Sequence, residues 1–217
     1  MRELLCEMLR LFYSKGWVSG TGGGICALES PGRLLLAPTG VHKERVTPDD
    51  LFVVDASSGE VLEPPADPAL RPSECGEIFR AIIAARGAGS VVHSHALAAV
   101  LACDLAPDDA LVIERLEMLK GIPNTTNTDR HMMPVISNTP REPELTSEVA
   151  RVLKDSRFGN AQSIGVRDHG AYLWGTDIWE AKKHTEVYHF LFEALVARAT
   201  TGGARNALPS EMRGERR

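Results

Sequence analysis

The sequence of 217 residues lacks several features that mark specialised protein classes. It has no basic excess, because 24 Lys and Arg stand against 29 Asp and Glu, a net charge of −5 with His neutral. A general nucleic-acid binder would present a basic face, so that class is disfavoured. No apolar run approaches the roughly 20 residues that a bilayer span requires. The sequence therefore predicts neither a nucleic-acid partner nor a membrane segment.

Cysteines are few, and none are close neighbours in the sequence. Cys6, Cys26, Cys75 and Cys103 form no Cys-x-x-Cys pair, which disfavours a zinc finger. The first residues show an amphipathic pattern rather than the apolar stretch of a secretory signal. We therefore expect four free thiols in a cytoplasmic protein, because that compartment is reducing.

The rest of the composition is that of an ordinary globular domain. Hydrophobic residues make up 43% and charged residues 24% of the chain, which excludes disorder over its bulk. At roughly 100–200 residues per domain, the length suits one large domain. We expect that domain over residues 1–199 and a flexible tail over residues 200–217, where the apolar periodicity stops.

Helical and strand patterns alternate along the domain. Apolar residues at helical spacing predict helices over residues 4–16, 73–87, 96–105, 144–158 and 178–199. Short apolar runs between turn residues predict strands over residues 25–28, 34–37, 51–55, 90–95, 111–114, 163–167 and 171–174. Because several strands follow one another in sequence, the pattern indicates one layered α/β domain with a mixed sheet.

The sharpest chemical signal is His93-Ser94-His95, at the end of an apolar strand. Side chains alternate between the two faces of a strand, so both imidazoles project from the same side. Two imidazoles on one face are placed to share a divalent metal ion. The alternative is a pair of hydrogen-bonded polar residues at the strand end, and the spacing favours neither interpretation.

A catalytic metal needs a third protein ligand and an open position for substrate. His169 is a candidate, because it lies in a tight polar turn after an apolar strand. His42 and His131 lie in loops and are weaker candidates. His184 and His189 share no face of the last helix, which favours surface or core roles. The spacing does not choose among these five histidines.

Three segments could hold an anion through backbone N–H groups. The run Gly20–Gly24 precedes a strand, whereas a dinucleotide-binding glycine loop opens a helix. Thr39-Gly40 forms a second turn, and Ser73 stands at the predicted N-cap of a helix. Each alone is better explained as an ordinary turn or cap. Together they raise the case for a phosphate pocket modestly.

Cys75 and two glutamates could also carry chemistry. Cys75 lies in the first turn of the helix after Ser73, a position that favours a reactive thiol. The alternative is a small buried hydrophobe, the common state of a free cysteine. Glu114 and Glu117 follow an apolar strand and could act as a general acid or base, although a solvated charge is the default for both.

These motifs in combination resemble the class II aldolase/adducin family. They are Gly20–Ile25, Ala37–Arg45, Ser73–Cys75, His93–His95, Glu117–Gly121, Asn138–Pro140 and His169–Gly175. The resemblance runs from about residue 3 to residue 199. It implies a single three-layer α/β/α domain with a mixed, largely antiparallel central sheet. It also implies a homotetramer that acts on a small phosphorylated sugar.

The resemblance assigns roles to particular residues. It implies one Zn²⁺, or another divalent ion, per subunit, held by His93, His95 and His169. Aldolase members carry a carboxylate at the position of Cys75, whereas the dehydratase branch carries a cysteine there, at the substrate site. That branch places its acid/base carboxylate at the position of Glu117, which makes Glu117 the expected catalytic residue.

The resemblance also suggests a substrate and a reaction. The family's phosphate pocket corresponds to Gly23, Gly24, Thr39, Gly40 and Ser73. The reaction expected in this branch removes water from 5-methylthioribulose 1-phosphate and gives 2,3-diketo-5-methylthiopentyl 1-phosphate, a step of methionine salvage. Residues 123–132 lack the aromatic, Tyr-containing segment expected in this branch, which leaves the substrate tail open. The alternatives are an aldolase, epimerase or dehydratase acting on a different phosphosugar, and a non-catalytic member, which would lack ligand histidines.

Overall fold

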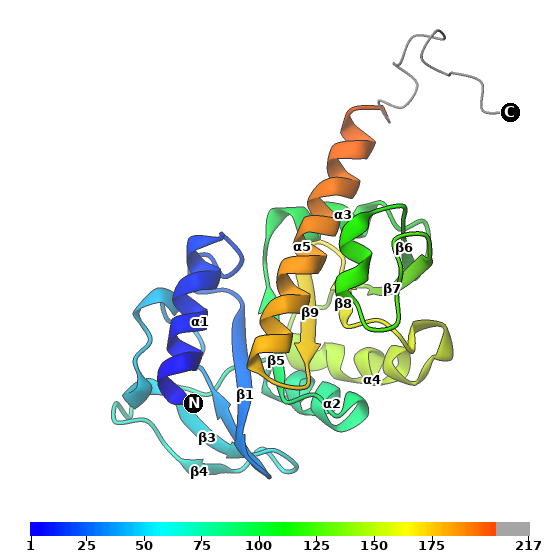
Figure 1. The fold of residues 1–217 in the computed structure, drawn as a ribbon. Coiled ribbons are helices and arrows are strands. Elements are labelled where there is room, and N and C mark those ends of the chain that lie inside the picture. Colours follow the sequence, from blue (N-terminus) through cyan, green and yellow to red (C-terminus); the bar gives the residue numbers. More distant parts are fainter. Residues whose placement is uncertain (203–217) are drawn as a thin grey trace, which may run out of the picture.

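The computed structural model describes residues 1–202, so residues 203–217 of the expected tail lie outside the described part. The described residues build one nine-stranded sheet in the order β4-β3-β2-β1-β5-β9-β8-β7-β6 (Figure 1). Its strands are β1 (Gly24–Ser30), β2 (Arg33–Leu36), β3 (Phe52–Asp55), β4 (Val61–Glu63), β5 (Ser90–Ser94), β6 (Ala110–Glu114), β7 (Arg130–Ile136), β8 (Ser163–Val166) and β9 (Gly170–Gly175).

The α-helices are α1 (Arg2–Ser14), α2 (Gly76–Arg86), α3 (Leu97–Asp104), α4 (Thr146–Lys154) and α5 (Ile178–Thr200). Short 3₁₀ turns are η1 (Lys43–Arg45), η2 (Pro48–Asp50), η3 (Glu117–Gly121), η4 (Glu142–Leu145) and η5 (Ser156–Phe158). No helix within residues 1–202 combines the length and the apolarity that crossing a membrane would need.

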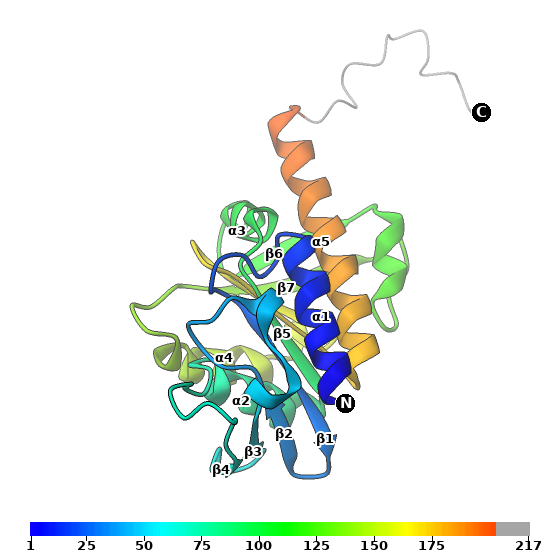
Figure 2. The ribbon, with the colours of Figure 1, turned by 90° about the vertical axis from the view of Figure 1, so that its left-hand side faces the viewer.

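Neighbouring strands pair antiparallel, except for the parallel pair of β7 and β8. The expectation of a mixed, largely antiparallel sheet is therefore confirmed. Helices α1, α3 and α5 cover one face and contribute to one apolar core, while α2 and α4 contribute to a second core on the other face. Figure 2 shows α1 and α5 on one side of the strands and α2 and α4 on the other. The domain thus has the three expected layers.

Side chains along β5 alternate between the two cores. Val92 packs with the core of α1, α3 and α5, and Val91 packs with the core of α2 and α4. Since alternate residues of a strand share a face, His93 projects to the α2–α4 side. This alternation decides which layer holds the candidate site.

Two strands are absent from the sequence prediction. β7 contains Pro134, and proline lacks the N–H that a strand ladder uses, so the sequence does not indicate a strand there. In the sheet, Pro134 lies opposite Ala110 of β6, and β7 pairs with β8 only through Val135 and Ile136. β4 is a short, exposed edge strand with no alternating pattern of burial.

Two helix boundaries also differ from the prediction. The helix expected over residues 144–158 is split into η4, α4 and η5. The break between α4 and η5 falls at Asp155, whose side chain accepts a hydrogen bond from the Arg157 N–H and caps the new turn. α2 begins at Gly76, with Cys75 as its N-cap residue. Ser73 is therefore not the helix cap; its Oγ accepts the Cys75 N–H at 3.3 Å.

We predict that Gly170→Ala will strongly destabilise the protein. Gly170 has φ +151°, and a Cβ there would lie 1.9 Å from the Ser94 carbonyl oxygen, where β5 and β9 meet. We expect the free energy of unfolding to fall by about 3 kcal/mol or more, measured by urea denaturation. Gly76→Ala is the matched control, because its Cβ would lie 3.6 Å from Leu36 in a helix, with an effect within about 1 kcal/mol. Equal stability of the two variants would contradict this account.

Candidate metal centre

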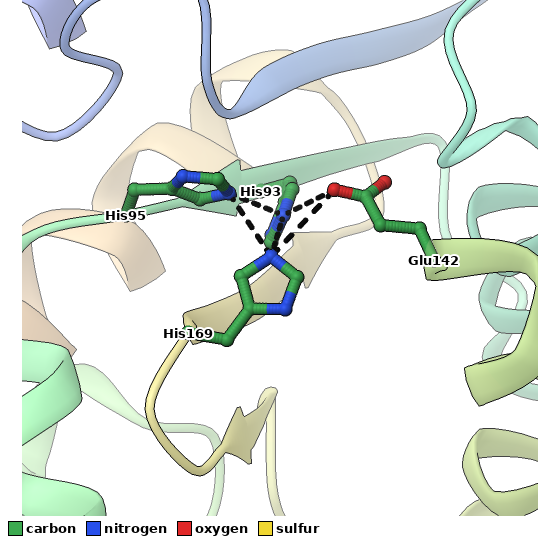
Figure 3. Close-up of side chains that lie close together, drawn as sticks. All are labelled: His93, His95, Glu142 and His169. Carbon is green, nitrogen blue, oxygen red and sulfur yellow. Dashed lines mark hydrogen bonds and ion pairs between the residues drawn. The ribbon is translucent and has the colours of Figure 1, made fainter. Parts of the chain in front are cut away.

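Three histidine side chains converge where β5 ends beside the turn between β8 and β9 (Figure 3). The Nε2 atom of His93 lies 2.8 Å from that of His95 and 3.1 Å from that of His169. His95 and His169 are separated by 3.1 Å at the same atoms. Three imidazole nitrogens that converge on one point can serve together as ligands of one small cation.

Strand pairing produces this convergence. His93 faces Tyr172 across the β5–β9 ladder, and the next pair joins Ser94 to Ala171. The β8–β9 turn therefore ends beside the last residue of β5, which places His169 at the side chains of the His-x-His pair. His95 lies just beyond the strand, where its N–H donates to the Trp17 carbonyl at 2.8 Å.

A fourth group at this point, Glu142, was missed in the sequence. Its Oε1 lies 3.4 Å from Nε2 of His93 and 3.6 Å from Nε2 of His169. The ligand atoms of Glu142 and the three histidines all lie within 4.8 Å of one another. Glu142 opens η4 shortly after β7, so the available signal was a carboxylate following a strand. That signal was lost because β7 itself was not predicted.

The charge states suit a divalent cation. Burial, together with the neighbouring His93 and His169, lowers the pKa of His95 to about 3. Burial also lowers the pKa of His93, so both rings are neutral near pH 7. Burial acts to raise the pKa of Glu142, but the attraction of the neighbouring His169 and His93 outweighs it and lowers the pKa below its usual value. Imidazole nitrogens and one carboxylate oxygen form a donor set that fits zinc and other first-row divalent ions.

Contacts at Nδ1 orient the rings of His93 and His169 so that their Nε2 atoms point toward the centre of the cluster. His169 Nδ1 lies 3.0 Å from Asn138 Oδ1, and His93 Nδ1 lies 3.2 Å from the Ala171 carbonyl oxygen. The His93 ring also stacks on Tyr172, with centroids 4.1 Å apart and planes 6° apart. Such outer contacts set the tautomer and the orientation of ligand histidines.

Gly22 makes room for His95. A Cβ on Gly22 would lie 2.5 Å from Nδ1 of the His95 ring. The glycine run, interpreted from the sequence as a possible anion-binding turn, therefore also serves the histidine cluster through close packing.

Cys75 joins the cluster through Glu142 and not as a reactive thiolate. Its Sγ donates a hydrogen bond to Oε2 of Glu142. Burial, and next the neighbouring carboxylate, raise the pKa of the Cys75 thiol well above its usual value. Of the two interpretations that the sequence left open for Cys75, these surroundings favour the buried thiol, because desolvation opposes the charged form.

The three turns proposed to hold phosphate lie side by side. Pro38 forms an isolated bridge with Pro72, and the Thr39 N–H donates to the Arg71 carbonyl, which joins the Thr39-Gly40 turn to the segment before Ser73. Gly23 and Gly40 both have positive φ, of +69° and +67°. The Thr39-Gly40 turn and the segment of Ser73 are thus adjacent, as a shared pocket requires.

A buried lysine, also missed in the sequence, connects two of these turns. The Lys43 ammonium donates to the carbonyl oxygens of Thr21, Pro38 and Val41 at 3.0, 3.2 and 3.3 Å. Its side chain passes beside Gly24, where a Cβ would lie 4.0 Å from Lys43 Cε. Lys43 thereby places a positive charge beside the expected phosphate pocket.

Glu117 is not brought to the histidines within one chain. It lies exposed on η3, where Lys120 and Asn127 donate hydrogen bonds to its two oxygens. Leu119 of η3 belongs to the core shared with α5, on the face of the sheet opposite to the His93 side chain. Glu114 is likewise exposed.

The remaining histidines lie outside the cluster. His131 Nε2 contacts the Tyr188 hydroxyl at 2.8 Å, His184 Nδ1 contacts the Trp174 carbonyl at 2.7 Å, and His189 Nε2 contacts the Ser94 hydroxyl at 2.8 Å. His184 and His189 are buried, in agreement with a core role, whereas His42 is exposed. His131 is buried too, but it lies on β7, so the expectation that it lies in a loop is wrong.

Comparison with known proteins agrees with this architecture. The family model for the Class II Aldolase and Adducin N-terminal domain matches residues 3–196. The chain belongs to this family. The solved L-fuculose-1-phosphate aldolase from Thermus thermophilus is similar in fold, with a TM-score of 0.69 and 23% identity over 94% of this chain and 100% of that one.

Other members of the class II aldolase/adducin family are more similar in sequence. Methylthioribulose-1-phosphate dehydratase of Xenopus tropicalis is 39% identical over 98% of this chain and 90% of its own length. The enzyme of that name from Gallus gallus is 40% identical over 90% of this chain and 82% of its own length. The similarity therefore covers most or nearly all of this chain.

We predict that Asn138→Ala will weaken metal binding without unfolding the protein. The exposed Asn138 side chain contacts Nδ1 of His169, and losing such an outer partner typically costs about 10–100-fold in metal affinity. Competition with a coloured chelator measures this loss. Asn160→Ala is the control, because its amide donates to Thr125 instead. Unchanged affinity in Asn138→Ala would refute the orienting role of this contact.

Proposed function

We propose that this protein is a methylthioribulose-1-phosphate dehydratase, a hydro-lyase of methionine salvage. The observation that carries the proposal is the near full-length similarity to enzymes of that name, at 39% identity over 98% of the chain. Cys75 adds support. The resemblance implies a cysteine at this position in the dehydratase branch and a carboxylate in aldolase members.

The proposed cofactor is one Zn²⁺ per subunit, held by His93, His95 and His169. Burial lowers the pKa of His93 and of His95, and hydrogen-bonding contacts orient the rings of His93 and His169, which supports this assignment. When bound, a divalent ion would polarise the substrate carbonyl and stabilise negative charge on its oxygen during proton removal. The four cysteines are free, which is compatible with the proposed reducing, cytoplasmic location.

The chain's own residues would bind the substrate at its phosphate end. We propose that Gly23, Gly24, Thr39, Gly40 and Ser73 form that pocket. The adjacency of their turns supports this, since backbone N–H groups at glycine turns favour anions. The buried Lys43 ammonium would lower the free energy of a bound phosphate through its charge. Fixing the phosphate orients the reacting carbons toward the histidine cluster.

The test is incubation of zinc-loaded protein with 5-methylthioribulose 1-phosphate, followed by mass spectrometry. We expect loss of one water, abolished by a chelator and by His93→Ala, because the ligand set then no longer retains the metal. Retro-aldol fragments in place of dehydration would instead indicate an aldolase. A fully metal-loaded protein that leaves this substrate unchanged would reject the proposed function.

We further propose that Glu117 acts as the acid/base in the site of a neighbouring subunit of a homotetramer. Its exposure on η3, on the sheet face away from His93, supports a role in trans. The carboxylate would pass a proton to the departing hydroxyl, and loss of such a group costs about 10²–10⁴-fold in rate.

Mixing two inactive variants tests this role. Glu117→Gln and His169→Ala should each lack activity, yet subunit exchange between them should restore activity to about one quarter of wild type. In a random mixture, one interface in four joins an intact histidine set to an intact Glu117. A mixture that stays inactive, although mass spectrometry shows mixed oligomers, would exclude the action in trans.

A further inference from the structure

Glu142 stands where a fourth metal ligand would stand. Around a tetrahedral ion with metal–ligand bonds of about 2.0–2.2 Å, ligand atoms lie about 3.3–3.6 Å apart. Glu142 Oε1 lies 3.4 and 3.6 Å from Nε2 of His93 and His169. These separations exceed the roughly 2.7–3.2 Å of ordinary N–H···O hydrogen bonds. The carboxylate therefore lies at a ligand's distance from His93 and His169, and all four ligand atoms lie within 4.8 Å of one another.

The two oxygens of this carboxylate have separate partners. Oε2 accepts the hydrogen bond from the Cys75 thiol, which leaves Oε1 directed at the histidine cluster (Figure 3). Cys75 is 4% exposed and stands at the N-cap of α2, so its Sγ is held by the packing of a helix end. The thiol thereby restricts how the Glu142 side chain can turn.

The charge of Glu142 has no permanent partner among residues 1–202. Its ion-pair contacts there are to His93 and His169, and no Lys or Arg nitrogen lies within 4.0 Å. Its side chain is 20% exposed. A carboxylate so far removed from water is costly unless a cation compensates it. A divalent ion among the three histidines would supply that compensation.

We propose that Glu142 is the fourth ligand of the metal when no substrate is bound, and that Cys75 is the residue that positions its carboxylate. The inference deepens the proposed function, and it rests on that function only for the presence of a metal. Substrate oxygens would then reach the metal by displacing Glu142 or by enlarging the coordination number. Of the four groups, Glu142 is carried on a short 3₁₀ turn, and not on or directly beside a paired strand.

Metal binding by Glu142→Gln tests the proposal directly. Metal-free protein is titrated with Co²⁺ or Zn²⁺ against a competing chelator, and the visible absorption of the Co²⁺ form is recorded. We expect affinity to fall by more than about 100-fold, because even an outer-shell partner is worth about 10–100-fold. The Co²⁺ absorption should change as well, since a carboxylate leaves the donor set.

The same turn offers a matched control. Glu144→Gln removes an equal charge two residues away, from a side chain that pairs with Arg141. It should leave the affinity and the Co²⁺ absorption at wild-type values. Cys75→Ala should weaken metal binding by less than Glu142→Gln does and shift the absorption. Cys75→Ser should restore both, because a hydroxyl can still donate to Oε2.

Each result bears on one claim only. Wild-type affinity and absorption in folded Glu142→Gln would overturn the proposal, whatever the catalytic activity. If that variant does not fold, Glu142→Asp takes its place, because its shorter side chain should withdraw the oxygen and change the Co²⁺ absorption. Glu142→Gln could lower the metal affinity while the wild-type protein never dehydrates 5-methylthioribulose 1-phosphate. That pair of results would support Glu142 as a ligand and reject only the proposed function.

Discussion

The antiparallel pairing of β5 with β9 is the constraint on which the rest of the site depends. In this register His93 pairs with Tyr172, and the β8–β9 turn, which carries His169, therefore lies at the end of β5. The same register needs Gly170, because any side chain there would collide with the Ser94 carbonyl. A shift by one residue would turn His93 to the opposite face of the sheet and disperse the cluster.

Packing then determines the chemistry of this cluster. Burial lowers the pKa of His93 and of His95, while the neighbouring His169 and His93 lower the pKa of Glu142 and keep it charged. Without a cation, the result is a negative charge beside the neutral rings of His93 and His95, which is costly in a poorly hydrated site. The structure thus concentrates donor groups at one point in the protonation states that metal binding requires.

The glycine run and Lys43 link this centre to the neighbouring turns. Gly22 lets the His95 ring approach the backbone, and two residues later the chain enters β1, which pairs with β5. Lys43 holds the carbonyl oxygens of both the Gly20–Gly24 run and the Pro38–Val41 turn. Metal ligands and the proposed phosphate turns are therefore parts of one packed unit.

The sequence alone determined the features that depend on local pattern. Apolar spacing predicted the five helices and seven of the strands, and period-two alternation placed His93 and His95 on one side of their strand. The motifs were sufficient to indicate the family, because they combine histidines, glycine turns and Cys75 at characteristic positions. β7 was not predicted, because Pro134 argues against a strand in the sequence. In the structure Pro134 nevertheless lies within β7, opposite Ala110 of β6.

Only the tertiary structure decided which distant residues meet. Five histidines were open as a third ligand from their spacing, and the β5–β9 register brings His169 to the pair. Glu142 carries no motif, and it became visible only when η4 was seen beside the histidines and Cys75. Glu117 is the opposite case. Its motif is recognisable in the sequence, but within one chain its side chain is exposed on η3, which packs against α5 and not beside the histidines. Contacts between segments far apart in sequence arise from packing and register, which no local pattern specifies.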